Sequence, residues 1–264
     1  MMNTKTNLGK TPTSWFSAVS VVLLSAYLLI LPGGPNVART EENRILVGFR
    51  QGKESESIPE GWELITYPGR AKNTLLLVAE GKKTVLHVKS LGSASALVKR
   101  PEVDIREFPI LVWRWKINRV VGMAVESQRD RNDSAARVRV IFGKGAEKPS
   151  TLPPEMEEFI ESLGIKRTPM EPPGFKIDYI WGNRLPQGKT LDFPGSRNHK
   201  VVVIQSGNDK AKQWVWEERN LIEDYESLFE AAPADLAGIV ILTDTDNTNE
   251  GVEAWYSSVV LMSQ

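Results

Sequence analysis

The residues best suited to hold a ligand lie in a short acidic loop near the end of the chain. An apolar run from Leu236 to Leu242 leads into the polar sequence TDTDNT, and a second apolar run from Ala254 to Met262 follows it. Runs of this length beside Asp and Asn predict two strands joined by a loop. The loop groups two carboxylates with an amide: Asp244, Asp246 and Asn247. Such oxygen-only sets suit a hard cation or the hydroxyl groups of a sugar.

Three interpretations of this loop stay open. An EF-hand would need glycine at its sixth position and glutamate at its twelfth. Counting from Asp244, those positions hold Asn249 and Trp255, so the loop is not an EF-hand. A Ca²⁺ ion or a sugar bound by Asp244, Asp246 and Asn247 stays compatible with the sequence, and no other cofactor is expected. Alternatively, the Asp and Asn side chains bond their own backbone and only shape the turn.

Tryptophans form two closely spaced pairs: Trp113 with Trp115, and Trp214 with Trp216. In a strand, residues two apart point to the same face. Exposed pairs would be candidate ligand-binding residues, because their flat rings can stack on sugars. Buried pairs in a sandwich core would show the same spacing. A chain without disulfides needs large apolar side chains inside, which favours the core interpretation.

Arginines alternate with apolar residues in two of the predicted strands: Arg114, Arg137 and Arg139. Together with Glu217 and Glu218 they would line a polar groove if their faces form the concave side of a sandwich. Arg137 would equally pair with Asp133 or Glu217, because an arginine fork holds a carboxylate at two points. The remaining interpretation is a sheet face open to solvent.

Nucleophilic catalysis has little support in this sequence. Cysteine is absent, the G-x-S-x-G motif is absent, and the only histidines, His87 and His199, have no evident partners. Serine triads and zinc sites therefore lack the residues they need. Carboxylate chemistry remains, with Asp244 or Asp246 and Glu217 or Glu218 as the acid and base of a polysaccharide hydrolase.

Short apolar or alternating runs predict strands along most of the chain. They are Leu75–Ala79, Thr84–Lys89, Ile110–Ile117, Ala136–Phe142, Ile177–Trp181, Val201–Gln205, Trp214–Glu218 and the two terminal runs. Helical spacing occurs at Pro154–Leu163 and Leu221–Phe229. Many strands without regular strand–helix alternation indicate an all-β fold, an antiparallel β-sandwich with a few short helices over residues 45–264. Its proline-rich segment, at about residues 143–174, is interpreted as an insertion.

The N-terminal segment indicates export. Lys5 and Lys10 precede an apolar run at residues 15–31, which predicts a signal peptide or a single-pass anchor within residues 1–31. Residues 32–44 would form a linker. The domain would then be periplasmic, either released or held to the inner membrane by residues 15–31.

Charge argues against nucleic acid as a partner. The chain has 33 basic and 33 acidic residues, for a formal net charge of zero. Proteins that bind nucleic acid usually carry a basic surplus that releases counterions from the phosphates. We therefore expect no nucleic-acid partner.

Several segments in a fixed order carry a resemblance to a known family: Leu111–Lys116, Ala136–Phe142, Asp178–Gly182, Trp214–Asn220, Gly238–Thr248 and Ala254–Tyr256. They resemble the bacterial family catalogued as domain of unknown function 3047, over roughly residues 45 to 262. The resemblance implies a jelly-roll β-sandwich of the kind found in carbohydrate-binding modules, behind an export signal. It implies no established activity.

These observations predict an exported, non-catalytic binding or structural domain of the cell envelope. Its partner would be an extracytoplasmic glycan or an envelope protein. Two alternatives are a carboxylate-dependent polysaccharide hydrolase and a scaffold subunit of an envelope complex.

Overall fold

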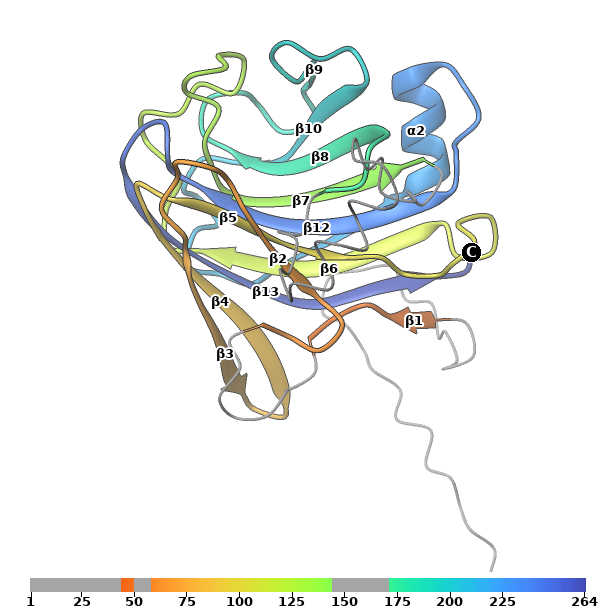
Figure 1. Cartoon of the computed structure of the whole chain (residues 1–264), viewed down its shortest axis with the longest axis horizontal. Helices are drawn as coiled ribbons and strands as arrows, with labels where there is room; N and C mark the ends of the chain where they lie inside the picture. The colour runs from red at the N-terminus through yellow and green to blue at the C-terminus, as the bar shows by residue number, and fades with distance from the viewer. Residues whose placement is uncertain (1–43, 50–57, 144–170) are drawn as a thin grey trace, which may run out of the picture. The chain divides into compact units, whose positions relative to one another are not determined.

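Alternation of apolar and polar residues places one row of side chains from each strand between two β-sheets. The computed structural model describes residues 44–49, 58–143 and 171–264, which Figure 1 shows in colour. These residues belong to one compact unit. Helix α2 (Leu221–Phe229) is the helix that accompanies the sheets in this part of the chain.

The first sheet is six-stranded. Its strands are β1 (Arg44–Leu46), β3 (Thr74–Glu80), β4 (Lys83–Leu91), β6 (Ile110–Ile117), β11 (Val215–Asn220) and β13 (Gly251–Met262). They pair in the order β11-β6-β13-β4-β3, with β1 beside β13, and every pair is antiparallel. Strand β11 is therefore an edge strand.

The second sheet is seven-stranded. Its strands are β2 (Glu63–Thr66), β5 (Ala94–Lys99), β7 (Ser134–Phe142), β8 (Phe175–Gly182), β9 (Thr190–Asp192), β10 (His199–Ser206) and β12 (Leu236–Asp244). Their order is β2-β5-β12-β7-β8-β10-β9. Strands β8 and β10 are parallel, so the expectation of a wholly antiparallel sandwich is wrong for this pair.

Four large aromatic side chains fill the space between the sheets. The ring centroids of Trp113 and Tyr179 are 5.5 Å apart, and those of Trp115 and Trp181 are 5.8 Å apart. All four are fully buried. The core interpretation is confirmed for Trp113 and Trp115, which come from β6 and meet the two residues from β8.

Tyr256 on β13 ties the two sheets together by hydrogen bonds. Its hydroxyl donates to the carbonyl oxygen of Leu242 on β12 at 2.9 Å. It also accepts from the backbone N–H of Arg137 on β7 at 3.3 Å and lies 3.1 Å from the hydroxyl of Thr243. A buried phenol needs such partners, because an unpaired polar group in the core costs stability.

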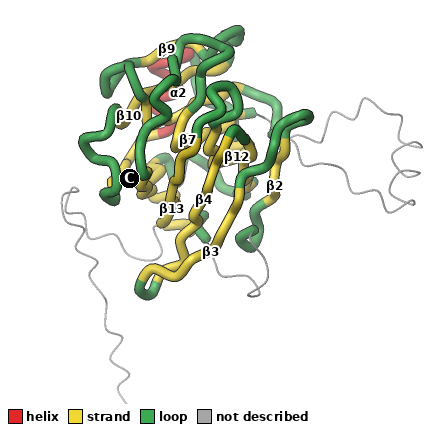
Figure 2. Tube along the Cα trace, turned by 90° about the vertical axis from the view of Figure 1, so that its left-hand side faces the viewer, coloured by secondary structure: helices red, strands yellow, loops and turns green. Residues whose placement is uncertain are grey.

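Helix α2 closes one end of the sandwich. Asn220 caps its first turn by accepting from the backbone N–H groups of Ile222 and Glu223. Tyr225 packs on Phe142 of β7, with ring centroids 4.8 Å apart. Figures 1 and 2 both place α2 at the end of the fold where β9 and β10 lie.

Most strands were predicted within three residues of their ends, and the helix at Leu221–Phe229 is confirmed. Strands β1, β2, β5 and β9 were missed. The segment 1–31, the linker up to residue 43 and the helix expected at Pro154–Leu163 lie outside the described residues, as does most of the insertion at 143–174. Among the described residues, no helix combines the length and apolar character needed to cross a membrane.

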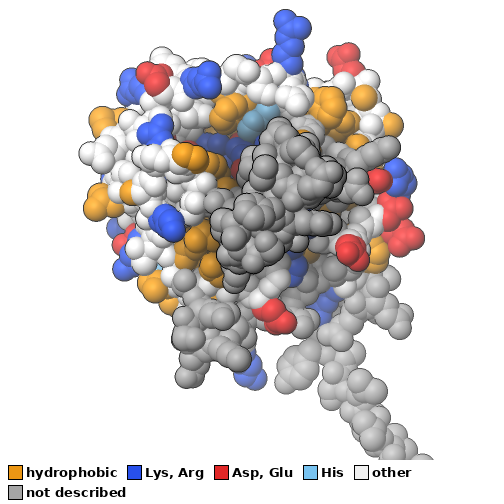
Figure 3. Space-filling view, in the orientation of Figure 1, with side chains coloured by type: hydrophobic (Ala, Val, Ile, Leu, Met, Phe, Trp, Pro, Cys, Tyr) orange, Lys and Arg blue, Asp and Glu red, His pale blue; other side chains and the backbone are white. Residues whose placement is uncertain are grey.

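Charges of both signs are mixed on the surface. Figure 3 shows acidic and basic side chains interspersed with apolar ones over one face. The formal net charge of zero agrees with this mixture. Local charge, rather than the total, therefore has to be considered at each candidate site.

We predict that Tyr256→Phe lowers the free energy of unfolding by about 1–3 kcal/mol, because it leaves buried polar groups unpaired. Urea unfolding measures the change. Tyr225→Phe is the matched control, since no described residue hydrogen-bonds its hydroxyl, and it should change stability by less than about 0.5 kcal/mol. Equal stability losses in the two variants would contradict the role given to Tyr256.

Candidate functional site

The candidate residues lie in four separate places. Asp244 ends β12, and Asp246 and Asn247 follow it in the acidic loop before β13. Arg137 is on the outer face of the seven-stranded sheet. Arg114, Trp214 and Trp216 are on the outer face of the six-stranded sheet, and Glu217 is at the edge between the sheets. The single polar groove expected from the arginines and glutamates does not form, because these residues lie on different faces.

The acidic loop crosses from one sheet to the other, since β12 and β13 belong to different sheets. Asp133 joins it from a distant part of the chain, and ligand atoms of Asp133, Asp244 and Asp246 all lie within 4.8 Å of one another. Asp133 accepts from the backbone N–H of Thr248 at 2.8 Å and from its hydroxyl at 2.6 Å. The backbone N–H of Asp246 donates to Asp244 at 3.3 Å.

Negative charge in this loop is only partly balanced. The Nε atom of Arg70 lies 2.9 Å from the carboxylate of Asp246. Burial raises the pKa of Asp244 to about 7, and the charge of Asp133 acts in the same direction. In the amide orientation that satisfies both of its side-chain atoms, Asn247 donates to Asp133 at 3.1 Å. Three carboxylates and an amide are ligands that Ca²⁺ accepts, and the same groups also bond one another as a turn.

Arg137 and Arg139 are buried, so the expectation of a solvent-facing arginine row is wrong for them. Both bond Asp178 on the neighbouring strand β8. Arg137 Nη1 lies 3.0 Å from Asp178, while Nε and Nη2 of Arg139 lie 2.6 and 2.9 Å from its two oxygens. The partners expected for Arg137, Asp133 and Glu217, are also wrong, because the register of β7 and β8 places Asp178 opposite Arg139.

This buried cluster holds its carboxylates ionised. Burial would raise the pKa of Asp178, but Arg139, followed by His199, outweighs it and holds the pKa well below its usual range. Burial also opposes ionisation of Glu171, yet Arg139 and Lys176 lower its pKa to about 2. His199, for which the sequence suggests no partner, begins β10. Its Nε2 atom lies 2.9 Å from a carboxylate oxygen of Asp178.

A second group of candidates forms a surface on the outer face of the six-stranded sheet. We call it the indole–cation surface, and it comprises Trp214, Trp216, Trp255, Arg114, Lys116 and Lys83. The guanidinium carbon of Arg114 lies 4.2 Å from the ring centroid of Trp214. The ammonium of Lys116 lies 4.9 Å from the ring of Trp214 and 4.6 Å from that of Trp255. The three indoles are half-buried, in contrast to the indoles of the core.

The tip of the β3–β4 hairpin completes this surface. The ammonium of Lys83 lies 5.6 Å from the ring of Trp216. Glu80 accepts from the indole N–H of Trp214 at 2.8 Å and from Arg114 at 3.0 Å. Burial, followed by repulsion from Arg114, lowers the pKa of Lys83. Three cationic side chains therefore lie beside these rings, and Glu80 bonds both Arg114 and Trp214.

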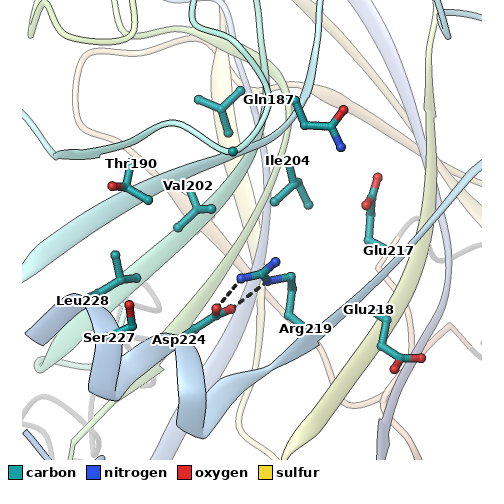
Figure 4. A pocket seen from close by; sticks show the side chains of 12 residues that line it. Gln187, Thr190, Val202, Ile204, Glu217, Glu218, Arg219, Asp224, Ser227 and Leu228 are labelled. Atoms are coloured by element: carbon teal, nitrogen blue, oxygen red, sulfur yellow. Dashed lines mark hydrogen bonds and ion pairs between the residues drawn. The ribbon is translucent and has the colours of Figure 1, made fainter.

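Glu217 lies on the inner side of β11, where it faces a cavity of about 260 Å³ between β10, β11 and α2. We call this the edge cavity, and its lining includes Gln187, Thr190, Ile204, Glu217, Asp224 and Ser227. Figure 4 shows the side chains of Gln187 and Glu217 turned toward one another, while Glu218 points away.

One oxygen of the Glu217 carboxyl is held by two donors. Its Oε1 accepts from the indole N–H of Trp115 at 3.1 Å and from the amide of Gln205 at 2.8 Å. Burial nevertheless raises the pKa of Glu217 to about 7, against the effect of these hydrogen bonds. A carboxyl that keeps its proton near neutral pH is able to donate as well as accept.

The acid–base pair expected for a hydrolase is not assembled. Glu217 faces the edge cavity and bonds Trp115 and Gln205, whereas Asp244 and Asp246 lie in the acidic loop. Sequence reasoning also missed Asp178 and Gln205, because their roles depend on which strands lie side by side. A buried Asp in a strand of apolar residues was the available signal for Asp178.

We predict that Asp178→Asn destabilises the fold by about 3–5 kcal/mol, because it leaves buried arginine charge without its partner. Chemical unfolding measures the loss. Asp192→Asn is the matched control: it removes an exposed pair with Lys200 and should cost less than about 1 kcal/mol. A cost for Asp178→Asn as small as that of the control would show that the cluster does not hold β7 and β8 together.

We predict that Glu217 makes stability fall as pH rises. The folded protein keeps this proton up to about pH 7, whereas the unfolded chain releases it near its ordinary pKa of 4.5. Stability is therefore full below that value and declines through about pH 7, by on the order of 2–3 kcal/mol. Glu217→Gln keeps an acceptor for Trp115 and does not ionise, so it should be the more stable form at about pH 8.

Urea unfolding at about pH 5 and about pH 8 checks this expectation. Glu107→Gln, at an exposed position before β6, is the control and should keep the wild-type pH profile. The prediction fails if the wild-type protein and Glu217→Gln change in parallel between the two pH values.

Comparison with known proteins finds a matching family and distant similarity to solved structures. No curated protein matches the sequence. One similar structure is the family 11 carbohydrate-binding module of a cellulosomal cellulase from Clostridium thermocellum. Its TM-score is 0.40 at 8% identity, and the alignment covers 84% of this chain and 95% of the module. Another is endoglucanase 3 of Trichoderma harzianum, from family GH12. Its TM-score is 0.41 at 7% identity, and the alignment covers 85% of this chain and 99% of the endoglucanase.

The family model described as protein of unknown function (DUF3047) matches residues 60–260. The match spans nearly all of the described sandwich, including β2 to β12 and most of β13. The resemblance seen in the sequence segments is thereby confirmed, and the chain belongs to the DUF3047 family.

Proposed function

We propose that this domain is a non-catalytic binding module that holds an acidic glycan on the indole–cation surface. The observation that carries the proposal is the grouping of three half-buried indoles with three cationic side chains on one sheet face. The other large aromatic residues of these strands are buried in the core, whereas these three indoles are only half-buried on the outer face.

Indoles on a sheet face suit sugar rings. An indole offers a flat apolar surface, and the C–H face of a pyranose can lie against it while the hydroxyl groups stay in water. Trp216 is on β11 and Trp255 is on β13, with β6 between them. Neighbouring strands are about 4.8 Å apart, so the rings span about 10 Å, which favours an extended ligand.

Charge favours an acidic ligand. Arg114 and Lys116 are held in place by contacts with the indoles and by Glu80, which is the carboxylate nearest to both. Lys83 lies beside Trp216, and its pKa is lowered first by burial and then by repulsion from Arg114. An anionic group bound between them would relieve this repulsion. Uronic-acid polymers carry such a group on each sugar.

The export expected from residues 1–31 would bring the domain to such polymers in the cell envelope. This location is part of the proposal. The separation of Glu217 from Asp244 and Asp246 supports binding rather than hydrolysis, because the hydrolase alternative depended on these carboxyls acting as a pair.

We predict that Trp216→Ala weakens binding of the full-length chain to polygalacturonate by about 5- to 30-fold, the effect of losing about 1–2 kcal/mol of contact. Isothermal titration calorimetry measures the affinity. Phe175→Ala is the matched control, because Phe175 is an aromatic residue that is 41% exposed on the other sheet. It should bind as the wild-type protein does.

The charge of the ligand is tested separately. Neutral dextran should bind more weakly than polygalacturonate, and added salt should reduce the difference. Lys116→Gln should weaken binding of the acidic polymer alone. Equal affinity for the two polymers would overturn the acidic assignment, and unchanged affinity in Trp216→Ala would overturn the indole–cation surface as the binding site.

A further inference from the structure

The edge cavity lies on the opposite side of β11 from the indole–cation surface. Trp216 points outward from this strand, while Glu217 points inward to the cavity. We propose that the edge cavity is a second binding site, which takes one small polyhydroxylated molecule of the size of a single sugar ring. The inference does not depend on the proposed function, because it concerns different side chains on a different face.

Cavity size limits the ligand. The volume is about 260 Å³, just below the range of roughly 300–1,000 Å³ that holds drug-sized molecules. An extended polymer would not fit inside. The exposed side chains of Gln187, Thr190 and Ser227 lie at the mouth, so a small molecule can enter from solvent.

Glu217 supplies a fixed polar group on one side. Trp115 and Gln205 both donate to its Oε1, which sets the orientation of the carboxyl group. Among the described residues none is hydrogen-bonded to Oε2, and Figure 4 shows the carboxyl group turned into the space beneath Gln187. This oxygen is available to a ligand hydroxyl.

The opposite side of the cavity is also polar and fixed. Asp224 accepts from Nε of Arg219 at 2.8 Å and from the hydroxyl of Tyr179 at 2.6 Å. Val202, Ile204 and Leu228 lie between the two polar sides. A sugar ring has the same division, with hydroxyl groups at its rim and C–H groups on its faces.

A purely structural role would not require this arrangement. Pairing the indole N–H of Trp115 needs one acceptor oxygen, which a glutamine at position 217 would supply without ionising. A carboxyl that burial keeps protonated instead lowers stability as pH rises. Groups of this kind are concentrated at functional sites. The cavity, its open mouth and its two polar sides together support a ligand.

Saturation-transfer NMR with the full chain tests the proposal. The probes are D-glucose, D-galactose and N-acetyl-D-glucosamine at about 10 mM, a concentration that detects millimolar binding. Ser227→Phe fills the mouth from α2, and Thr190→Tyr fills it from β9. Glu226→Phe is the matched control, since Glu226 is an exposed neighbour on α2 outside the cavity lining.

We expect at least one probe to give a signal with the wild-type protein and with Glu226→Phe. Ser227→Phe and Thr190→Tyr should each reduce its affinity by at least about tenfold. Absence of signal from all three probes would overturn the inference, as would unchanged binding in both filled variants. Trp216→Ala should leave this signal intact, so failure here is distinguishable from failure of the glycan-binding proposal.

Discussion

The polar atoms of the buried aromatic side chains constrain the rest of this fold. The indoles and the phenol between the sheets contribute apolar area, but an N–H or O–H group buried without a partner costs stability. Among the described residues the indole N–H of Trp113 has no such partner. Three of these groups reach partners near the same open edge: Trp115 bonds Glu217, Tyr179 bonds Asp224, and Trp181 bonds the carbonyl of Gly207. The packing of the core therefore orients the polar groups of the edge cavity.

Strand alternation divides the chemistry of β6 and β11 between two faces. On β6, Trp113 and Trp115 face the core, while Arg114 and Lys116 face outward. Strand β11 sends Trp216 outward and Glu217 inward, so a one-residue slip would exchange the two proposed sites. The observed register places Trp216 opposite Arg114 and so brings indoles beside cations.

The middle strands of the seven-stranded sheet are buried on both faces. Every residue of β7 is buried, although Arg137 and Arg139 face away from the core. Asp178 makes this possible, since it bonds both arginines and stays ionised in spite of burial. Apolar side chains on β5 and β12 lie on the same outer face. This face is stabilised as a second small core with an ion cluster rather than as a wet sheet surface.

Local patterns in the sequence determined the elements. Alternation at Ile110–Ile117 and helical spacing at Leu221–Phe229 predicted the strand and the helix, because each depends on neighbouring residues and burial on one side. Tertiary structure alone decided the partners. Asp178 meets Arg139 through the register of β7 and β8, and Gln205 meets Glu217 because β10 and β11, from different sheets, lie close together. Such pairings join residues that are distant in the chain, so no local spacing in the sequence encodes them.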